Sequence, residues 1–332
     1  MRVAFLGTPR IAVPALQSLV ATGHTITLVI TQPDRPLGRS AEPVPPAVKQ
    51  EAITRELRVA QPRAVRTIEF LDLVRSSRSD VLVVVAYGRI LPASVLGVAA
   101  HGAINVHFSL LPRYRGAAPV QWALARCERI TGVTTMAMSE GMDEGDILLQ
   151  REVSIEPEEH CPALQERLAG IGASLLVETL VRLERGDLQR HPQDHALATY
   201  APRLRREDGD GDLSLPAREI EGRIRGFDPW PGVWVRADTR RLRLIRARAA
   251  ADGTVCDEPP GRVLALAGGA LRIACGGGSV LDVLAVQPEG GKVLSSRDAV
   301  NGRIVRPGVR LESTGAAWSD AGSRPEQDRG SE

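Results

Sequence analysis

The chain has 332 residues, of which 43% are hydrophobic and 25% are charged, with a formal net charge of +2. At roughly 100–200 residues per domain, this length predicts one large domain or two modest ones, each with its own core. No apolar run approaches the roughly 20 residues of a membrane helix. The first apolar run, Val3–Leu6, is too short for a signal peptide. We therefore expect a cytoplasmic protein with no membrane partner.

Cysteine and aromatic content excludes two further classes of function. The four cysteines, Cys127, Cys161, Cys256 and Cys275, show no CxxC or other metal-ligand spacing. We predict that they are buried, reduced thiols and that the protein holds no metal. Aromatic residues make up only 3% of the chain, which is too few for a long platform of stacked bases.

Charge is unevenly distributed along the sequence. Residues 1–202 contain 21 basic and 21 acidic side chains, whereas residues 203–311 contain 19 basic and 14 acidic ones. Residues 312–332 contain 2 basic and 5 acidic side chains, so the last segment is acidic. A basic second half indicates a polyanionic partner, although this signal is weak when taken alone.

The first half alternates strand-like and helix-like segments. Apolar residues from Ile11 to Val20 recur at helical spacing. Compact apolar or β-branched runs predict strands at Val3–Leu6, Thr25–Ile30, Val81–Val85 and Ala103–His107. Strands separated by helices predict an α/β fold with an open, mostly parallel sheet of the Rossmann-like kind.

The second half has a different pattern. A long amphipathic helix is expected over Leu164–Leu183, and the polar, charged segment 190–209, which is interrupted by Pro192, Pro202 and Gly209, is predicted to be a linker. We therefore expect one domain over 1–189 and a second over 210–311, with a disordered acidic tail over 312–332. After a short helix at Ala217–Arg225, short alternating runs predict a small antiparallel, OB-like β-barrel with strands at Val233–Val235, Leu242–Ile245, Gly261–Leu266, Leu271–Ala274 and Val280–Val286.

Three polar residues are candidates for chemistry. Asn105 and His107 lie two residues apart in a predicted strand and therefore point to the same side, near its carboxyl end. Asp143 lies in the loop Gly141–Asp146, whose glycines predict a tight turn that could bring a carboxylate beside the imidazole. Each residue also has a structural interpretation: a turn asparagine, a strand-capping histidine and an exposed loop acid.

The segment from Asn105 to Pro119 resembles the signature of the 10-formyltetrahydrofolate-dependent formyltransferases. Asp143-Glu144-Gly145, 38 residues after Asn105, matches the position of that family's catalytic carboxylate. Further segments resemble the members that act on methionyl-tRNA: Phe5–Pro9, Thr31–Pro36, Val84–Gly88 and Phe227–Gly232. The resemblance extends in register over about residues 1–311.

This resemblance implies transfer of a formyl group from the co-substrate 10-formyltetrahydrofolate to the α-amine of methionine on initiator tRNA, for translation initiation. It implies that Asn105 and His107 stabilise the oxygen of a tetrahedral intermediate, where each donor is worth about 10²–10³ in rate. Asp143 would assist proton transfer. It also implies a folate pocket lined by Ser109, Leu110, Leu111, Pro112 and Tyr87.

Arginines are the expected contacts to initiator tRNA, because cationic side chains neutralise phosphates. Arg240, Arg241 and Arg243 lie in the basic second half, and the resemblance places Arg39 near the acceptor stem. Ser40-Ala41-Glu42 departs from the lysine-rich continuation that is usual in bacterial members. Trp230 and Trp234 are interpreted as barrel core, and the protein is expected to be a monomer.

Other functions stay open at this stage. The same folate chemistry could serve a nucleotide-linked amino sugar or glycinamide ribotide, although neither acceptor needs a basic second domain. A non-catalytic folate- or RNA-binding protein is disfavoured by the three polar residues together. A nicotinamide oxidoreductase is disfavoured because Gly7-Thr8-Pro9 is not part of a GxGxxG fingerprint.

Overall fold

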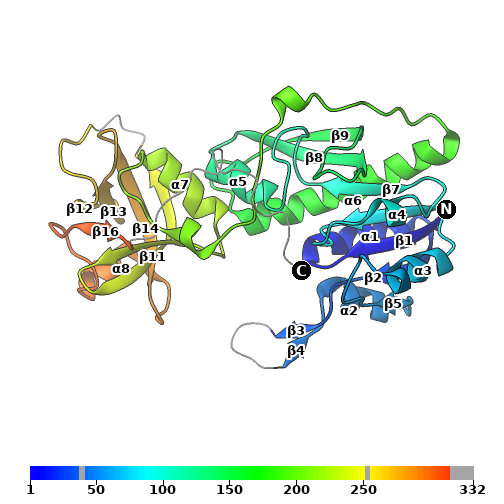
Figure 1. Ribbon diagram of the computed structural model, residues 1–332. Coiled ribbons are helices and arrows are strands. Elements are labelled where there is room, and N and C mark those ends of the chain that lie inside the picture. The colour runs from blue at the N-terminus through cyan, green and yellow to red at the C-terminus, as the bar shows by residue number, and fades with distance from the viewer. Residues whose placement is uncertain (37–41, 251–254, 315–332) are drawn as a thin grey trace. The chain divides into compact units, whose positions relative to one another are not determined.

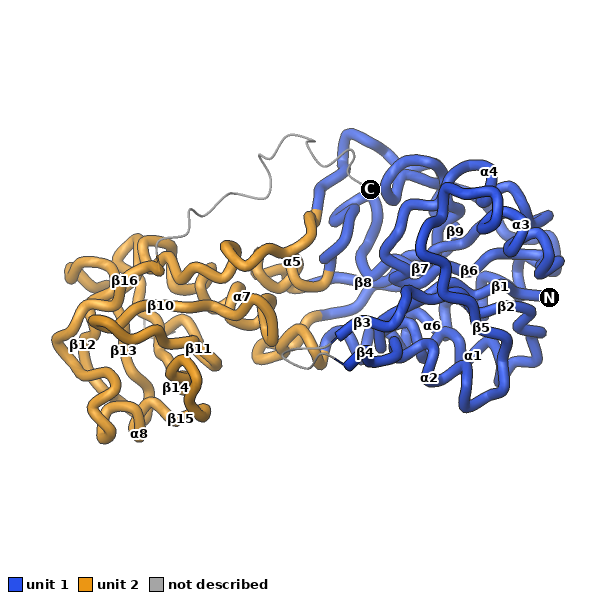
Figure 2. The backbone as a smooth tube through the Cα atoms, turned by 60° about the horizontal axis from the view of Figure 1, so that its bottom comes forward, with its two compact units in different colours: residues 1–119, 130–154, 164–200 blue, residues 120–129, 155–163, 201–332 orange. Residues whose placement is uncertain are grey.

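The computed structural model describes residues 1–36, 42–250 and 255–314, and it divides into two compact units (Figure 2). Unit 1 contains residues 1–119, 130–154 and 164–200, and unit 2 contains residues 120–129, 155–163 and 201 onward. The change from one unit to the other after Tyr200 lies inside the predicted linker 190–209. The units differ from the predicted domains because two segments before residue 164 belong to unit 2. Among the described residues, no helix is long and apolar enough to cross a membrane.

Unit 1 is built on a seven-stranded sheet with the order β5-β2-β1-β6-β7-β8-β9. The five strands from β5 to β7 are parallel, while β8 and β9 are antiparallel, so the predicted mostly parallel α/β sheet is confirmed. The strands are β1 (Arg2–Gly7), β2 (Thr25–Ile30), β5 (Val59–Ala60), β6 (Val81–Val85), β7 (Ala103–His107), β8 (Ile130–Ala137) and β9 (Ile147–Ser154). A separate pair is formed by β3 (Arg35–Pro36) and β4 (Pro43–Val44).

Helices cover both faces of this sheet (Figure 1). They are α1 (Val13–Ala21), α2 (Ala47–Thr54), α3 (Ile68–Ser76), α4 (Ala93–Leu96) and α6 (Cys161–Arg185), with short 3-10 turns at Arg10–Ala12 and His195–Leu197. On one face, Leu82 and Val84 of β6 share a buried cluster with Phe70 of α3 and Val95 of α4. On the other, α6 lies against β8, where Thr179 and Thr135 are hydrogen-bonded at 2.8 Å. The sheet is therefore a buried central layer.

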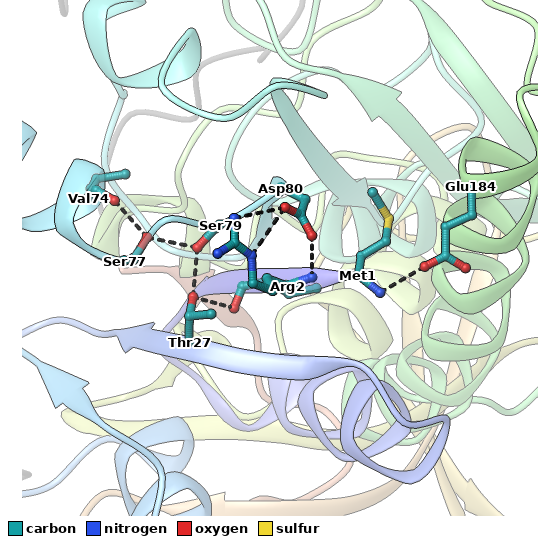
Figure 3. A network of polar contacts seen from close by, with 9 residues as sticks. Met1, Arg2, Thr27, Val74, Ser77, Ser79, Asp80 and Glu184 are labelled. Atoms are coloured by element: carbon teal, nitrogen blue, oxygen red, sulfur yellow. Dashed lines mark hydrogen bonds and ion pairs between the residues drawn. The ribbon is translucent and has the colours of Figure 1, made fainter.

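The amino ends of the strands are joined by polar contacts (Figure 3). The Arg2 side chain donates to Asp80, just before β6, at 3.1 Å. The amino group of Met1 donates to Glu184 of α6 at 2.7 Å, and Thr27 of β2 bonds the Ser79 hydroxyl at 2.7 Å. These contacts fix one end of the sheet, which leaves the carboxyl ends of the strands as the place where a site can form.

Unit 2 contains a second seven-stranded sheet with the order β12-β13-β14-β11-β10-β16, and β15 pairs with β14. All its pairs are antiparallel, and a bridge between Arg262 and Arg310 joins its two edges, so the predicted small antiparallel barrel is confirmed. The elements are α5 (Pro119–Ala125), α7 (Ala217–Gly226), α8 (Ser296–Asn301), β10 (Val233–Ala237), β11 (Arg240–Ala249), β12 (Val263–Ala267), β13 (Ala270–Ala274), β14 (Val280–Pro288), β15 (Leu294–Ser295) and β16 (Leu311–Ser313), with a 3-10 turn at Arg206–Gly209.

Strand β16 corrects the predicted start of the tail. Glu312 and Ser313 pair with β10, and Glu312 forms an ion pair with Arg236. The next residue, Thr314, donates its backbone N–H to Asp210 at 2.6 Å. The prediction of disorder from residue 312 was wrong for these three residues, because the edge of β10 offers backbone partners to Glu312 and Ser313 and the Asp210 carboxylate binds Thr314. The rest of the predicted tail, 315–332, lies outside the described residues.

Packing around α7 explains why residues 120–129 belong to unit 2. Trp122 of α5 meets Phe227 edge-on, with ring centroids 5.4 Å apart, and its indole N–H donates to the Pro202 carbonyl at 2.8 Å. A Cβ at Gly222 of α7 would lie 2.7 Å from the Leu124 carbonyl oxygen, so only glycine allows this approach. These contacts join segments about a hundred residues apart, which local sequence patterns do not report.

Candidate active site

The end of β7 carries the first two candidate residues. The strand lies between β6 and β8, with Asn105 opposite Val84 on one side and Met136 on the other. Asn105 is half-buried, and only 6% of the His107 side chain is exposed. The two residues share one face of the strand because side chains alternate along it. His107 Nε2 lies 2.9 Å from the Tyr114 carbonyl oxygen. Since a carbonyl only accepts, Nε2 carries a proton and donates it to this bond.

Asp143 approaches the other nitrogen of the same imidazole. Its Oδ2 lies 3.6 Å from His107 Nδ1, and 18% of its side chain is exposed. The same oxygen accepts the backbone N–H of Gly116 at 2.8 Å. A separation of 3.6 Å suits an ion pair but is longer than a hydrogen bond. Because Nε2 is already the donor toward Tyr114, Nδ1 can donate to the carboxylate only when the imidazole is protonated on both nitrogens.

The loop that carries Asp143 is tight, as its glycines predict. Asp143 itself has a φ of 54°, in the left-handed region that non-glycine residues rarely occupy. Gly145 lies so close to β8 that a Cβ there would be 1.7 Å from the Ala137 carbonyl oxygen. A side chain at residue 145 would therefore displace this loop and, with it, the Asp143 carboxylate.

The predicted folate segment follows β7 and is held by the two antiparallel strands. Thr134 of β8 donates to the Ser109 carbonyl at 2.7 Å and accepts the Leu111 N–H at 3.2 Å. Gln150 of β9 donates to the Leu111 carbonyl at 2.8 Å. The Ser109 hydroxyl donates to the Arg113 carbonyl at 2.6 Å, which closes a turn over Leu110 and Pro112. The Leu111 N–H is thus already bound within the protein and is not a spare donor for a ligand.

Tyr87, another predicted folate residue, follows β6. Its side chain is 1% exposed and belongs to the core cluster that contains Leu6 and Val84. Burial raises the pKa of its phenol to about 12. Among the described residues, its hydroxyl has no hydrogen-bond partner. The ring is therefore core, and the hydroxyl is the atom through which Tyr87 could meet a ligand.

Two buried side chains at this site are absent from the sequence predictions. Arg115 is 1% exposed, and its Nε and Nη2 donate to Gln193 Oε1 at 3.1 and 2.7 Å. The Gln193 amide nitrogen in turn donates to the carbonyls of Asp143 at 2.8 Å and Gly145 at 2.7 Å. Gln193 lies in the segment predicted to be a linker. The only signal that could have identified it as a site residue is the buried cation that it binds, Arg115. Arg115 lies inside the quoted signature but has no role assigned there.

Comparison with known proteins identifies the family. A formyl transferase model matches residues 1–180, and a model described as the formyl transferase C-terminal domain matches residues 203–303. Methionyl-tRNA formyltransferase of Geobacter metallireducens is 44% identical over 311 residues, covering 94% of this chain and 98% of that protein. The enzyme of the same name from Anaeromyxobacter dehalogenans is 48% identical over 302 residues, covering 91% and 97%. The chain belongs to the methionyl-tRNA formyltransferase family.

Solved structures share the fold at lower identity. A sugar 3N-formyl transferase, WlaRD, crystallised in the presence of dTDP and 5-N-formyl-THF, has a TM-score of 0.63 and 15% identity, covering 85% of this chain and 97% of that one. HypX from Aquifex aeolicus, in complex with tetrahydrofolic acid, has a TM-score of 0.57 and 19% identity, covering 92% and 48%. At these identities the comparison shows the fold alone. The resemblance to the methionyl-tRNA formyltransferases drawn from the sequence is confirmed.

In unit 2, the three arginines that the sequence grouped together differ in exposure and in their ion-pair partners. Arg240 is exposed at the start of β11. Arg241 pairs with Glu289 at 3.0 Å, and its guanidinium lies 5.0 Å from the ring centroid of Trp234. Arg243 is turned inward: its side chain is 16% exposed and donates to Asp228 at 3.0 Å. Arg39 lies outside the described residues.

The Asp228 carboxylate is the centre of an internal charge cluster in the family motif Phe227–Gly232. His160 Nδ1 lies 3.2 Å from its Oδ2, and Arg243 binds the other oxygen. The hydrogen bond from His160, followed by the charges of His160 and Arg243, holds the pKa of Asp228 below its ordinary value. Arg243 is therefore largely enclosed and already paired with a carboxylate.

Trp230 corrects an interpretation made from the sequence. It is 54% exposed rather than part of the barrel core, because the motif carries it out at a turn before β10. Trp234 is half-buried and donates its indole N–H to the Pro231 carbonyl at 3.0 Å. Both line a cavity of about 510 Å³, together with Arg206, Arg241, Asp210 and Glu289. The exposed indole is that of Trp230, whereas the indole beside the Arg241 guanidinium is that of Trp234.

Within the described residues, no three His, Cys, Asp or Glu side chains are grouped as a metal site would require. All four cysteines are free thiols. Cys161 and Cys275 are buried, while Cys127 and Cys256 are half-buried, so complete burial was correct for two of the four. Burial raises the pKa of Cys161 and of Cys275 to about 12, so neither is a ready nucleophile.

Proposed function

We propose that this protein transfers the formyl group of 10-formyltetrahydrofolate to the α-amine of methionyl-initiator tRNA. The observation that carries this proposal is the contact between His107 and Asp143 at the carboxyl end of β7, on the strand face that Asn105 shares. Transfer needs a donor for a developing oxyanion and a group that moves the amine's proton. These three side chains supply both within one strand end and one loop.

His107 and Asp143 act as a pair in this proposal. The amine nitrogen bonds to the formyl carbon, and the bond from that carbon to the folate nitrogen breaks. The proton that the amine loses must reach the leaving nitrogen. Nε2 of His107 is held by Tyr114, so Nδ1 is the nitrogen that exchanges this proton. The Asp143 carboxylate, 3.6 Å away, stabilises the imidazolium while the proton is held.

Asn105 is the fixed donor in the same arrangement. Its amide N–H can donate to the formyl oxygen as negative charge develops there, without any change in its own protonation. One preorganised donor of this kind is worth about 10²–10³ in rate. His107 can donate a second hydrogen bond through Nδ1 only when both ring nitrogens are protonated. The negative charge on the formyl oxygen and the positive charge on the imidazole therefore appear together.

We place the folate co-substrate beside Ser109–Pro112. The support is that Thr134 and Gln150 hold this segment rigid through its backbone, with Ser109 and Leu111 buried and Leu110 and Pro112 half-buried. The buried hydroxyl of Tyr87 is the polar atom that a bound ligand would satisfy. The four carbonyls of this segment each accept one hydrogen bond within the protein, so a planar, hydrogen-bonding ring would use their second lone pairs, and the Leu111 N–H is excluded from that role.

For initiator tRNA, we propose phosphate contacts from Arg240 and Arg241, with Arg39 contributing from outside the described residues. Arg243 supports this surface by holding Asp228. A matched pair of variants separates the two roles. Arg240→Ala is expected to weaken tRNA binding and reduce the slope of log K against log salt by about 0.9 per lost phosphate contact. Arg243→Ala is expected to lower thermal stability instead.

The defining experiment mixes the purified protein with 10-formyltetrahydrofolate and methionyl-initiator tRNA and measures N-formylmethionine after base hydrolysis of the ester. Methionyl-elongator tRNA, free methionine and a nucleotide-linked amino sugar are parallel acceptors. We expect kcat/KM to be highest for the initiator tRNA by at least about tenfold, which equals about 1.4 kcal/mol of differential binding. Equal or better formylation of the amino sugar would overturn the proposed acceptor.

A further inference from the structure

Gln193 is a buried amide in a segment whose sequence predicts a linker. It lies in unit 1 with 6% of its surface exposed, between a bridge that pairs His191 with Ile147 of β9 and the 3-10 turn at His195–Leu197. Its side-chain oxygen contacts none of the three residues of the proposed site. Its side-chain nitrogen binds the backbone of the loop that carries Asp143.

The amide of Gln193 uses both of its donors on that loop. Its nitrogen lies 2.8 Å from the Asp143 carbonyl oxygen and 2.7 Å from the Gly145 carbonyl oxygen. Its oxygen accepts twice from Arg115, at 3.1 and 2.7 Å. A side chain in this place must donate twice on one side and accept on the other, which a glutamine amide does and a carboxylate cannot.

Arg115 supplies the fixed end of this arrangement. Its guanidinium is almost wholly buried, with Gln193 Oε1, His195 Nδ1 at 3.3 Å and Glu144 Oε1 at 3.7 Å around it. Its own backbone N–H donates to the Thr199 carbonyl at 2.8 Å. A buried cation with so many partners has little freedom to move. The loop is therefore tied through Gln193 to a rigid anchor.

We infer that Gln193 is a positioning residue that sets the Asp143 carboxylate opposite His107. The inference rests on the proposed function of Asp143. The loop needs such a clamp because Asp143 holds a φ of 54°, a strained conformation for a non-glycine residue that persists only where surrounding contacts enforce it. Two hydrogen bonds on the carbonyls flanking Glu144 enforce it here.

The sharpest test is Gln193→Glu, which keeps the length of the side chain and the acceptor for Arg115 but removes both donors. We expect kcat to fall about 10²-fold, because a displacement of about 1 Å in a reacting group has an effect of that size. KM for folate and for tRNA should stay within about twofold, because neither binding segment is touched. Gln193→Met, which has no charge, is measured beside it in case the new carboxylate unfolds the loop.

A structural measurement accompanies the kinetics. The Gly116 N–H donates to Asp143 Oδ2, so its hydrogen exchange reports whether the carboxylate stays in place. We expect faster exchange at Gly116 in both Gln193 variants. The matched control is Gln150→Glu, which makes the same chemical change at the folate segment. It should raise KM for folate and leave exchange at Gly116 unchanged.

Asp143→Asn is assayed in parallel so that two kinds of failure can be told apart. Wild-type kcat in both Gln193 variants, with Asp143→Asn inactive, would overturn the positioning role and leave the proposed function intact. A loss of kcat without faster exchange at Gly116 would overturn it equally. Full activity of Asp143→Asn would instead remove the proposed role of the carboxylate itself.

Discussion

Replacing Asp143 by asparagine tests the central electrostatic claim about this site. The change keeps the shape of the side chain, and the amide oxygen can still accept the Gly116 N–H now bound at 2.8 Å. What it removes is one negative charge 3.6 Å from His107 Nδ1. The fold should therefore be nearly unaffected, while the imidazolium loses its counter-charge.

The size of the effect follows from that distance. At 3.6 Å and an effective dielectric constant of 20, two unit charges attract by about 4.6 kcal/mol. If this attraction is present in the transition state and absent in the free enzyme, its loss lowers kcat/KM by about 10³-fold. The value lies inside the range of about 10²–10⁴ that is typical of general acid–base groups.

The assay is single-turnover formylation of methionyl-initiator tRNA at saturating 10-formyltetrahydrofolate, with tRNA binding measured separately by filter retention. We expect the rate to fall by about three orders of magnitude with unchanged binding of both substrates. A fall of less than about fivefold, in a variant with wild-type thermal stability, would refute the reasoning. In that case the 3.6 Å contact would have no part in the chemistry.

Three further outcomes are expected. Gly145→Ala should inactivate the enzyme, since its Cβ would meet a strand carbonyl at 1.7 Å, whereas Gly170→Ala, in open space on α6, should raise the free energy of unfolding by about 0.5–1 kcal/mol in urea titrations. Thr134→Val should lower that free energy by about 1–3 kcal/mol and raise KM for folate, because it leaves two buried backbone groups unpaired. Asp228→Asn should lower the free energy of unfolding at neutral pH but not in strong acid. The hydrogen bond from His160 lowers the pKa of Asp228 below its ordinary value of 3.8. The stabilisation that the carboxylate provides is therefore complete above pH 3.8 and is lost as the pH falls through the pKa of the folded state. Urea titrations at several pH values check this, and a pH-independent difference would contradict it.

The sequence by itself determined the parts of the protein that depend on local order. Alternation along Ala103–His107 put Asn105 and His107 on one face, and the compact apolar run Val81–Val85 predicted a strand, which is buried along its whole length. Glycines around Asp143 required a tight loop. The spacing of the motifs determined the family, because the signature Asn105–Pro119 and the carboxylate of Asp143 at a fixed interval identify it without any coordinates.

Only the tertiary structure decided which distant groups meet. Gln193 lies 50 residues from Asp143 and looks like linker in the sequence, since an amide's partners are set by packing and not by its neighbours. From the sequence, Arg243 is expected to be a surface cation, but in the structure it donates to Asp228. Trp230 is expected to be part of the core, but it is exposed at a turn. Hydrogen bonds and ion pairs act over about 3–4 Å, whatever the separation along the chain, so side-chain roles of this kind follow from the fold.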